Sequence, residues 1–267
     1  MMRTFIFNIF FYLTTVIYVI SCLIASLIPG RAALMAALKR YTKVMVWGMR
    51  RIGGMDIHVS GKENIPASGP VIIASKHQSY GDGFVIFSGF DDLSFVTGDH
   101  LEKFWGLKRI LTKMNAVVID SCGGSDSRKK MEEQAEKIRN EGRRLLIFPE
   151  GHLSKIGTHH KYRKGIWHLQ QDFGCPVIPV ANTLGQRWNQ TDWVKFTGTA
   201  HIEYLEPIPP GLEKDEFMAL LQERIESRSI ELLDLENPGA LNPDDIGRLE
   251  ENKVARAKRL AREAEAG

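Results

Sequence analysis

Cysteine is scarce in this sequence, and one common catalytic signature is missing altogether. Cys22, Cys122 and Cys175 are the only cysteines among 267 residues and stand far apart. Such a set forms neither a disulfide framework nor a zinc motif, and it suits a reducing compartment. The chain also lacks the G-x-S-x-G elbow that a hydrolase using water as acceptor would need. A formal net charge of +3 is too small to indicate a nucleic-acid-binding protein.

Charge is absent from the first part of the chain, where no charged residue occurs between Thr4 and Gly30. A helix needs about 20 apolar residues to cross a hydrocarbon core of ~30 Å, and this run exceeds that length. No small-x-small cleavage site precedes a plausible mature start, so an anchor is favoured over a signal peptide. We therefore expect residues 1–54 to hold a membrane anchor and an interfacial helix.

Basic residues follow the apolar run and set its expected orientation. Arg3 alone precedes the run, whereas six Lys or Arg residues follow it between Arg31 and Arg51. The positive-inside rule then places the remaining chain on the cytoplasmic side of an inner membrane of the bacterial type. Residues 32–51 combine an apolar stripe with a basic face. This pattern is typical of a helix on an anionic membrane, and a helix packed on a soluble domain is the alternative.

Short apolar runs alternate with helical patterns from about residue 55 onward. Runs rich in β-branched residues and bounded by Gly, Pro or Asp predict buried strands, and TAHIEYLEPI predicts a half-exposed one. The alternation indicates a single α/β domain over 55–234, with a mostly parallel central sheet flanked by helices. Residues 235–267 form a charged tail that we expect to be solvated. The expected buried strands are 70–75, 93–98, 115–120, 144–149 and 176–182, and the expected helices between them are 81–90, 100–113, 126–142 and 160–173.

His77 and Asp82 are separated by four residues and directly follow the predicted strand 70–75. Ligands of open α/β sheets bind at the carboxyl ends of strands, so this position suits a site. The carboxylate can accept one imidazole N–H and leave the other nitrogen as a base, or it can cap the start of the next helix. With no protein nucleophile in the motif, such a base would act on a hydroxyl brought by the substrate.

Several histidines raise the question of a metal. They lack the i, i+4 pair with a nearby acid that a zincin helix would have. We therefore expect no metal site. The histidines concerned are His152, His159, His160 and His168.

Four short motifs follow one another along the chain, namely H-x-x-x-x-D at His77 to Asp82, VVIDS, FPEGHLS and VIPVA. In this order and spacing they resemble the family of bacterial 1-acylglycerol-3-phosphate acyltransferases, over about residues 55–234. The resemblance implies a membrane-bound O-acyltransferase that moves a fatty acyl group from an acyl thioester to the free hydroxyl of a lysolipid. The acceptor it implies is lysophosphatidic acid, and the product is phosphatidic acid.

The resemblance also implies roles for individual residues and partners. His77 would be the general base for the acceptor hydroxyl, and Asp82 would orient it. Glu150 and Gly151 would belong to the wall that receives the lysolipid. The thioester would come from acyl-CoA or an acyl-carrier protein, with no further cofactor, and the membrane would supply the lipid acceptor.

The chain departs from the family pattern where cations are expected. Ser121 and Leu153 replace two family arginines, His152 replaces a threonine, and Gly98 aligns loosely with a family lysine. Arginine forks match phosphate oxygens, so these replacements weaken the grip on a phosphomonoester. One hypothesis is therefore a lyso-aminolipid acceptor of the ornithine-lipid type, which lacks that phosphate. In the other, cations at new positions hold the phosphate, the candidates being Lys108, Arg109, Arg128, Lys129 and Lys164.

Overall fold

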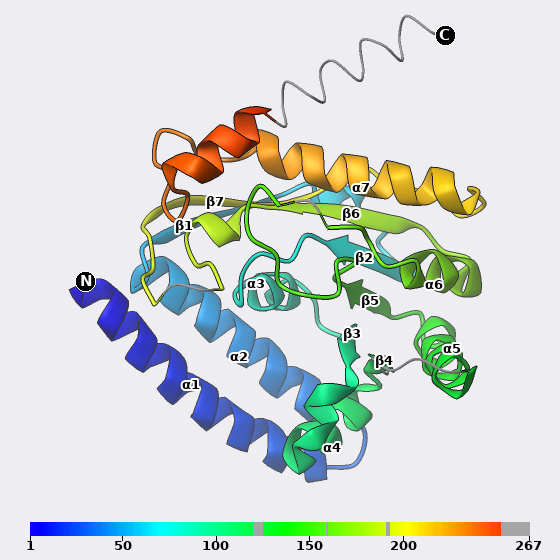
Figure 1. The fold of residues 1–267 in the computed structure, drawn as a ribbon. Coiled ribbons are helices and arrows are strands. Elements are labelled where there is room, and N and C mark those ends of the chain that lie inside the picture. Colours follow the sequence, from blue (N-terminus) through cyan, green and yellow to red (C-terminus); the bar gives the residue numbers. More distant parts are fainter. Residues whose placement is uncertain (120–124, 159, 191–192, 252–267) are drawn as a thin grey trace, which may run out of the picture.

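The computed structural model describes residues 1–119, 125–158, 160–190 and 193–251, with backbone alone for 125–131. Three layers are visible in Figure 1, in which a central sheet lies between the α1–α2 pair and a cover that includes α7. This architecture confirms the predicted single α/β domain preceded by a long apolar helix.

The seven strands form one sheet in the order β1-β7-β6-β2-β5-β3-β4. Every neighbouring pair is parallel except β6 and β7, which run antiparallel. All six predicted strands are present within a few residues of their expected bounds. The first strand was not predicted; it pairs with β7. The bounds are β1 Met55–Ser60, β2 Val71–Ser75, β3 Leu93–Gly98, β4 Val117–Ile119, β5 Arg144–Ile147, β6 Val177–Asn182 and β7 Gly198–Tyr204.

Helices cover both faces of the sheet, and the alternation of side chains along β2 shows how. Ile72 and Ala74 face a core shared with α5, α6 and α7, whereas Val71 and Ile73 face a core shared with α1, α2 and α3. A strand buried on both faces is therefore apolar at every position, as parallel strands under two helical layers are. The helices are α1 Met2–Leu27, α2 Ala32–Arg51, α3 Asp82–Ser88, α4 Trp105–Met114, α5 Ser125–Asn140, α6 Gly165–Phe173 and α7 Lys214–Glu231, and the short 3-10 turns are Lys62–Asn64, Asp99–Lys103 and Leu184–Gln186.

Helix α1 lies along α2 and is attached to the domain by one face (Figure 1). Phe7 is fully buried and meets the Trp188 ring edge-on at 5.2 Å between centroids. A Cβ at Gly48 of α2 would lie 2.0 Å from the Phe10 ring, so only glycine permits this close approach. The Asn8 amide donates to the Trp193 carbonyl at 3.3 Å. Helix α1 is thus packed against the domain at several points.

The opposite face of α1 is apolar and exposed. The most apolar 18-residue window of the whole helix has a mean hydropathy of 2.1, and only 22% of that window is buried. A helix of this length and composition can cross or enter a membrane, whereas a core helix of a soluble protein would be mostly buried. The large side chains on this face, all at least 45% exposed, are Phe5, Ile6, Ile9, Tyr12, Leu13, Val16, Ile17, Ile20, Ile24 and Leu27.

The beginning of the charged tail is not solvated as expected. Leu241 and Leu249 are buried and pack against Ile156 of the domain. The Asn237 carbonyl accepts a hydrogen bond from Arg187, a fully buried residue that also pairs with Asp234. Two leucines are enough apolar surface to hold a mostly polar segment against the domain. Residues 252–267 of the predicted tail lie outside the described residues.

Candidate active site

His77 and Asp82 lie in contact at the carboxyl end of β2. The fully buried strand ends at Ser75, a tight loop follows, and α3 begins at Asp82. The His77 Nδ1 atom lies 3.0 Å from Asp82 Oδ2. The Asp82 side chain is completely buried, while that of His77 is 21% exposed. An Nδ1–H donated to Asp82 leaves the basic lone pair on Nε2, which is the tautomer a general base requires.

Asp82 also shapes the loop that carries the histidine. Its Oδ2 accepts the main-chain N–H groups of Gln78 and Ser79, both at 2.8 Å. The hydroxyl of Ser79 accepts the N–H of Gly81 at 2.9 Å and is fully buried. Of the two alternatives left open by the sequence, the structure shows the contact with the imidazole, whereas the start of α3 has no side-chain cap and Asp82 accepts N–H groups of the preceding loop instead.

The imidazole plane is fixed from a second side. The ring of Phe148, which directly follows β5, stacks on His77 with 3.8 Å between centroids and 16° between planes. β5 is parallel to β2 and is its hydrogen-bonded neighbour, so the two strands end at the same edge of the sheet. The stacked ring and the buried carboxylate together leave the imidazole little freedom to rotate.

Glu150 lies beneath the histidine and not in an open wall. It is 1% exposed. Its Oε1 accepts the main-chain N–H of His77 at 3.0 Å, and its Oε2 receives the ammonium of Lys76 at 3.1 Å. The prediction assigned Glu150 to the surface that receives the lysolipid. In the structure both carboxylate oxygens face groups of this chain.

Gly151 turns the chain back over the histidine. It has φ +74°, a left-handed conformation that favours glycine, and its N–H donates to the Phe148 carbonyl at 3.0 Å. After the turn, the N–H and hydroxyl of Ser154 both donate to the His77 carbonyl, at 2.8 and 3.1 Å. The segment from Glu150 to Ser154 therefore binds both the N–H and the C=O of His77.

The remaining predicted acceptor residues lie around this turn. His152 is exposed, with its ring edge-on to His160 at 4.5 Å between centroids, and Leu153 is half-buried. Lys164 is exposed at the start of α6. Ser121 and the side chains of Arg128 and Lys129 lie outside the described residues. The other candidate cations are distant, since Arg109 and Lys108 belong to α4, where Arg109 donates to Ser26 of α1.

The cation beside the glycine turn is Arg163, which the sequence reading did not single out. Its N–H donates to the Pro149 carbonyl at 2.7 Å, and its Nε would lie 3.3 Å from a Cβ placed on Gly151. The side chain is exposed. The signal that could have found it is the KYRKG segment, whose basic residues follow the glutamate motif. Within the described residues, no carboxylate forms an ion pair with any of the four cations near the turn, Lys155, Lys161, Arg163 and Lys164.

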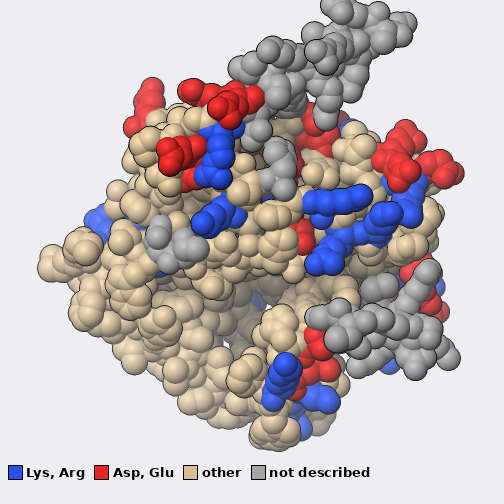
Figure 2. Space-filling view, viewed as in Figure 1, with Lys and Arg blue, Asp and Glu red and all other residues tan. Residues whose placement is uncertain are grey.

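Figure 2 shows how differently charge is distributed over this face of the molecule. Acidic and basic side chains gather over the upper half, which holds α6 and α7 in Figure 1. The lower left, which holds α1 and α2, is nearly free of charge. The side of the molecule with α6 and α7 is therefore charged, and it adjoins an apolar side with α1 and α2.

Behind Glu150 lies a buried polar group that the sequence reading also missed. Lys76 donates to Glu226 of α7 at 2.7 Å, and the Tyr162 hydroxyl donates to the same oxygen at 2.8 Å. Burial, and then the charge of Glu226, raise the pKa of Tyr162 well above its ordinary value, so the phenol remains a donor. A lysine directly after a fully buried strand is itself a signal, because a buried ammonium requires a buried acid.

An apolar cavity of about 260 Å³ opens beside the histidine loop. It lies between α2, α3, β3 and α4, and α3 supplies both Asp82 and part of the cavity wall. Tyr80 of the loop that follows His77 lines this cavity. The lining residues are Leu38, Tyr41, Thr42, Tyr80, Gly83, Phe84, Phe87, Phe95, Leu101, Leu107, Ile110, Leu111 and Met114.

The described part of the chain holds no group of three or more His, Cys, Asp or Glu residues placed to bind a metal ion. His152 and His160 contact each other, and His160 Nε2 lies 3.3 Å from the Thr158 hydroxyl. His168 lies on α6 beside Trp167. His159 lies outside the described residues.

Comparison with known proteins shows which family this chain belongs to. The profile of the family described as Acyltransferase matches residues 56–183. The chain is 32% identical over 185 residues to the 1-acyl-sn-glycerol-3-phosphate acyltransferase of Pseudomonas aeruginosa, covering 68% of this chain and 71% of that protein. The chain belongs to this acyltransferase family.

The chain is also similar to a human protein and to a solved bacterial structure. The human 1-acyl-sn-glycerol-3-phosphate acyltransferase alpha is 25% identical over 182 residues, which cover 67% of this chain and 64% of the human protein. The crystal structure of PlsC, the 1-acyl-sn-glycerophosphate (LPA) acyltransferase of Thermotoga maritima, aligns with a TM-score of 0.70 at 22% identity. That alignment covers 86% of this chain and 96% of PlsC, and it supports the fold of this acyltransferase as a whole.

Proposed function

We propose that this acyltransferase transfers a fatty acyl group from an acyl thioester to the free hydroxyl of lysophosphatidic acid, giving phosphatidic acid. The observation that carries the proposal is the His77–Asp82 pair, held at the carboxyl end of β2 beside an apolar cavity. The Pseudomonas aeruginosa and human relatives are named for this reaction, which supports the same substrate class here.

In the proposed mechanism His77 acts as a general base. Its Nε2 takes the proton of the acceptor hydroxyl while that oxygen attacks the thioester carbonyl. The tetrahedral intermediate then collapses, the C–S bond breaks, and the imidazolium returns the proton to the thiolate. Asp82 stabilises the imidazolium through Nδ1. General-base assistance of this kind contributes about 10²–10⁴-fold to the rate, and the route needs no acyl-enzyme.

The apolar cavity is the proposed seat of the acyl chain. Tyr80, Gly83 and Phe84 line it and belong to the loop and helix that carry the catalytic pair. A chain of CH₂ groups gains about 0.8 kcal/mol for each one removed from water, so an apolar chamber at this position can hold the donor's acyl group near the base. Acyl-CoA or an acyl-carrier protein would deliver it, and the proposal includes no other cofactor.

Arg163 and its neighbours are the proposed contacts for the acceptor's phosphate. The guanidinium lies beside the Gly151 turn. The segment that contains this turn binds both the main-chain N–H and the C=O of His77. A planar guanidinium matches phosphate oxygens in pairs, so Arg163 can supply the grip that Leu153 lacks. Lys155 and Lys164 are exposed near the same turn. This placement favours the hypothesis of cations at new positions.

A lyso-aminolipid acceptor is the second candidate, because an apolar and an aromatic residue occupy the turn itself. Leu153 is half-buried there and His152 is exposed. The deciding assay compares lysophosphatidic acid with a lyso-ornithine lipid under the same acyl donor. Comparable or better turnover of lysophosphatidic acid, lost in an Arg163→Leu variant through a higher KM, supports the phosphate proposal. Preference for the aminolipid would replace it.

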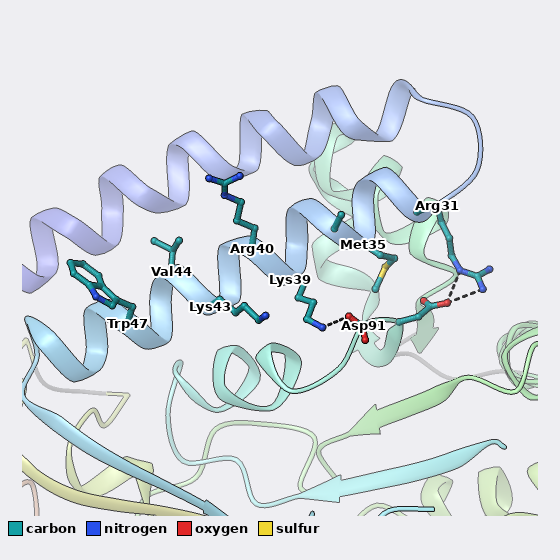
Figure 3. A pocket seen from close by; sticks show the side chains of 11 residues that line it. Arg31, Met35, Lys39, Arg40, Lys43, Val44, Trp47 and Asp91 are labelled. Atoms are coloured by element: carbon teal, nitrogen blue, oxygen red, sulfur yellow. Dashed lines mark hydrogen bonds and ion pairs between the residues drawn. The ribbon is translucent and has the colours of Figure 1, made fainter. Parts of the chain in front are cut away.

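The membrane is the proposed location of the acceptor and of the enzyme. Helix α2, which lies along α1, borders a groove of about 1040 Å³ with Trp47 at one end and Asp91 and Asp92 on its far side. Figure 3 shows Lys39 directed toward Asp91 and Arg31 paired at the other end, while Arg40 and Lys43 extend from the same helix. Basic side chains and tryptophan beside an apolar face suit the headgroup region of an anionic membrane. The proposed side is the cytoplasmic one.

The test of the proposed function is a His77→Ala variant assayed with a long-chain acyl-CoA and lysophosphatidic acid. The purified wild-type enzyme in detergent should form phosphatidic acid, and the variant should lose at least about 10²-fold in kcat with an unchanged circular dichroism spectrum. A fully active variant, or a wild-type enzyme that only hydrolyses the thioester, would refute the proposal.

A further inference from the structure

A lysine is buried directly next to the proposed base. Lys76 follows β2 and precedes His77, and only 1% of it is exposed. An unpaired ammonium in such a position would cost several kcal/mol, so its retention depends on buried acids. The chain supplies two of them from distant segments, Glu150 at 3.1 Å and Glu226 at 2.7 Å.

The first acid connects the lysine to the base. One oxygen of Glu150 faces the Lys76 ammonium, and the other accepts the main-chain N–H of His77 at 3.0 Å. The main chain of Lys76 is held as well, since its N–H donates to the Val180 carbonyl at 3.1 Å and its C=O accepts the Asn182 amide at 3.2 Å. The residue before the base is therefore fixed through both its backbone and its side chain.

The second acid connects the lysine to the covering helix. Glu226 belongs to α7, 150 positions along the chain from Lys76, and the Tyr162 hydroxyl shares its Oε1. The exposed fractions of the Glu150 and Glu226 side chains are 0% and 9%. One ammonium thus joins the ends of β2 and β5 to the opposite layer of the fold.

We propose that Lys76 is a positioning residue for His77, acting through Glu150. This inference rests on the proposed function, in which His77 is the base. Without the ammonium, the buried Glu150 carboxylate would lose the ion pair that holds it in place, and the His77 N–H would lose a fixed acceptor. Displacement of a catalytic group by ~1 Å costs about 10²-fold in rate. Loss of Lys76 can therefore lower the rate although the residue contacts no substrate.

The test is a double-mutant cycle of Lys76→Met and Glu150→Gln in the full-length protein. Each single variant should lower kcat about 10²-fold and leave the KM values for both substrates within about threefold. Lys76→Met should also change the pH dependence of kcat, because the variant removes a buried positive charge next to the base. The double variant removes both charges of the Lys76–Glu150 pair and keeps an amide oxygen for the His77 N–H, while Glu226 keeps the Tyr162 hydroxyl. It should recover about tenfold over Lys76→Met.

Controls separate this inference from its alternatives. Lys62→Met, at an exposed lysine on a surface turn, should behave as wild type. If the single variants do not fold, the double variant carries the test and should lie about tenfold below wild type in kcat. Wild-type kcat and pH profile in Lys76→Met, or a folded double variant no better than that single, would overturn the proposal. An active His77→Ala enzyme would instead overturn the proposed function.

Discussion

Charged side chains are buried under the active site, and apolar side chains are exposed along α1. Lys76 and Glu150 are each 1% exposed, whereas Leu13 and Ile17 are each 60% exposed. In the buried region under the active site, every charged group named above has a hydrogen-bond partner in this chain. The exposed apolar face of α1 is not covered by other side chains of the described residues. Polar burial here therefore defines internal geometry, and apolar exposure defines the surroundings the protein needs.

The largest expected effect comes from placing charge on the exposed apolar face of α1. Leu13→Glu, Ile17→Glu and Ile20→Glu combined should remove on the order of 5 kcal/mol of membrane affinity, since each side chain contributes about 1.5–3 kcal/mol when taken from water. The protein should move from the membrane pellet to the supernatant and keep its fold in detergent. Leu235→Glu, at an exposed residue outside α1, is the matched control. A triple variant that still sediments with membranes would contradict the comparison.

The next effect concerns the buried side. Asp82→Asn keeps an oxygen for the N–H groups of Gln78 and Ser79 but removes the anion that faces the imidazole. It should lower kcat about 10³-fold or more with little change in the unfolding temperature. Asp82→Ala should lower both, because the loop then loses its acceptor. Steady-state rates and thermal melts separate the variants, and a fully active Asp82→Asn would exclude the orienting role.

A smaller change removes one hydrogen bond from the buried group. Tyr162→Phe takes away the hydroxyl that donates to Glu226 and leaves the Lys76 ion pair in place. A hydrogen bond to a charged group contributes about 1.5–3 kcal/mol, so denaturant unfolding should show a loss of that order. Turnover should stay within about threefold of wild type. The control is Tyr12→Phe on the exposed face of α1. Equal stability of the two variants would mean that the network does not support the fold.

The smallest effect is a pH dependence at a half-buried histidine outside both regions. Burial, and then the neighbouring His58, lower the pKa of His201 below its ordinary value of 6.5. The unfolded chain therefore binds the proton first, and stability falls as pH drops below 6.5 through the folded-state pKa. Thermal melts from about pH 7.5 to about pH 5.5 should show a smaller decline in His201→Gln than in wild type. Identical declines would assign the acid sensitivity to the buried carboxylates instead.

The sequence allowed the strand ends and the His77–Asp82 pair to be predicted, because both depend on local patterns. Apolar runs bounded by Gly, Pro and Asp specify strands, and parallel strands bring their carboxyl ends to one edge. The first strand escaped prediction because MDIHVS includes a polar residue at every second position and lies at the sheet edge beside β7.

The rest of the site could not be predicted because it depends on contacts between distant segments. Nothing near Lys76 in the sequence indicates that Glu226 will approach it, since α7 is placed by tertiary packing that includes Phe217, Leu221 and Ile225. Arg163 lies in the basic KYRKG segment, but its contact with the Gly151 turn depends on how the loop between them folds. Glu150 was predicted to face the acceptor, and its burial follows from that same tertiary pairing with Lys76.

The attachment of α1 to residues 193–195 has a consequence for how the protein is made. The Thr4 and Asn8 contacts there join positions 191 and 185 apart in the chain. At roughly 5–20 residues per second, the first helix leaves the ribosome about 10–40 s before those partners exist. Lipid can cover its apolar face during that interval, and the domain cannot. With the proposed membrane location, insertion therefore precedes folding, and the finished domain closes onto a helix that the bilayer already holds.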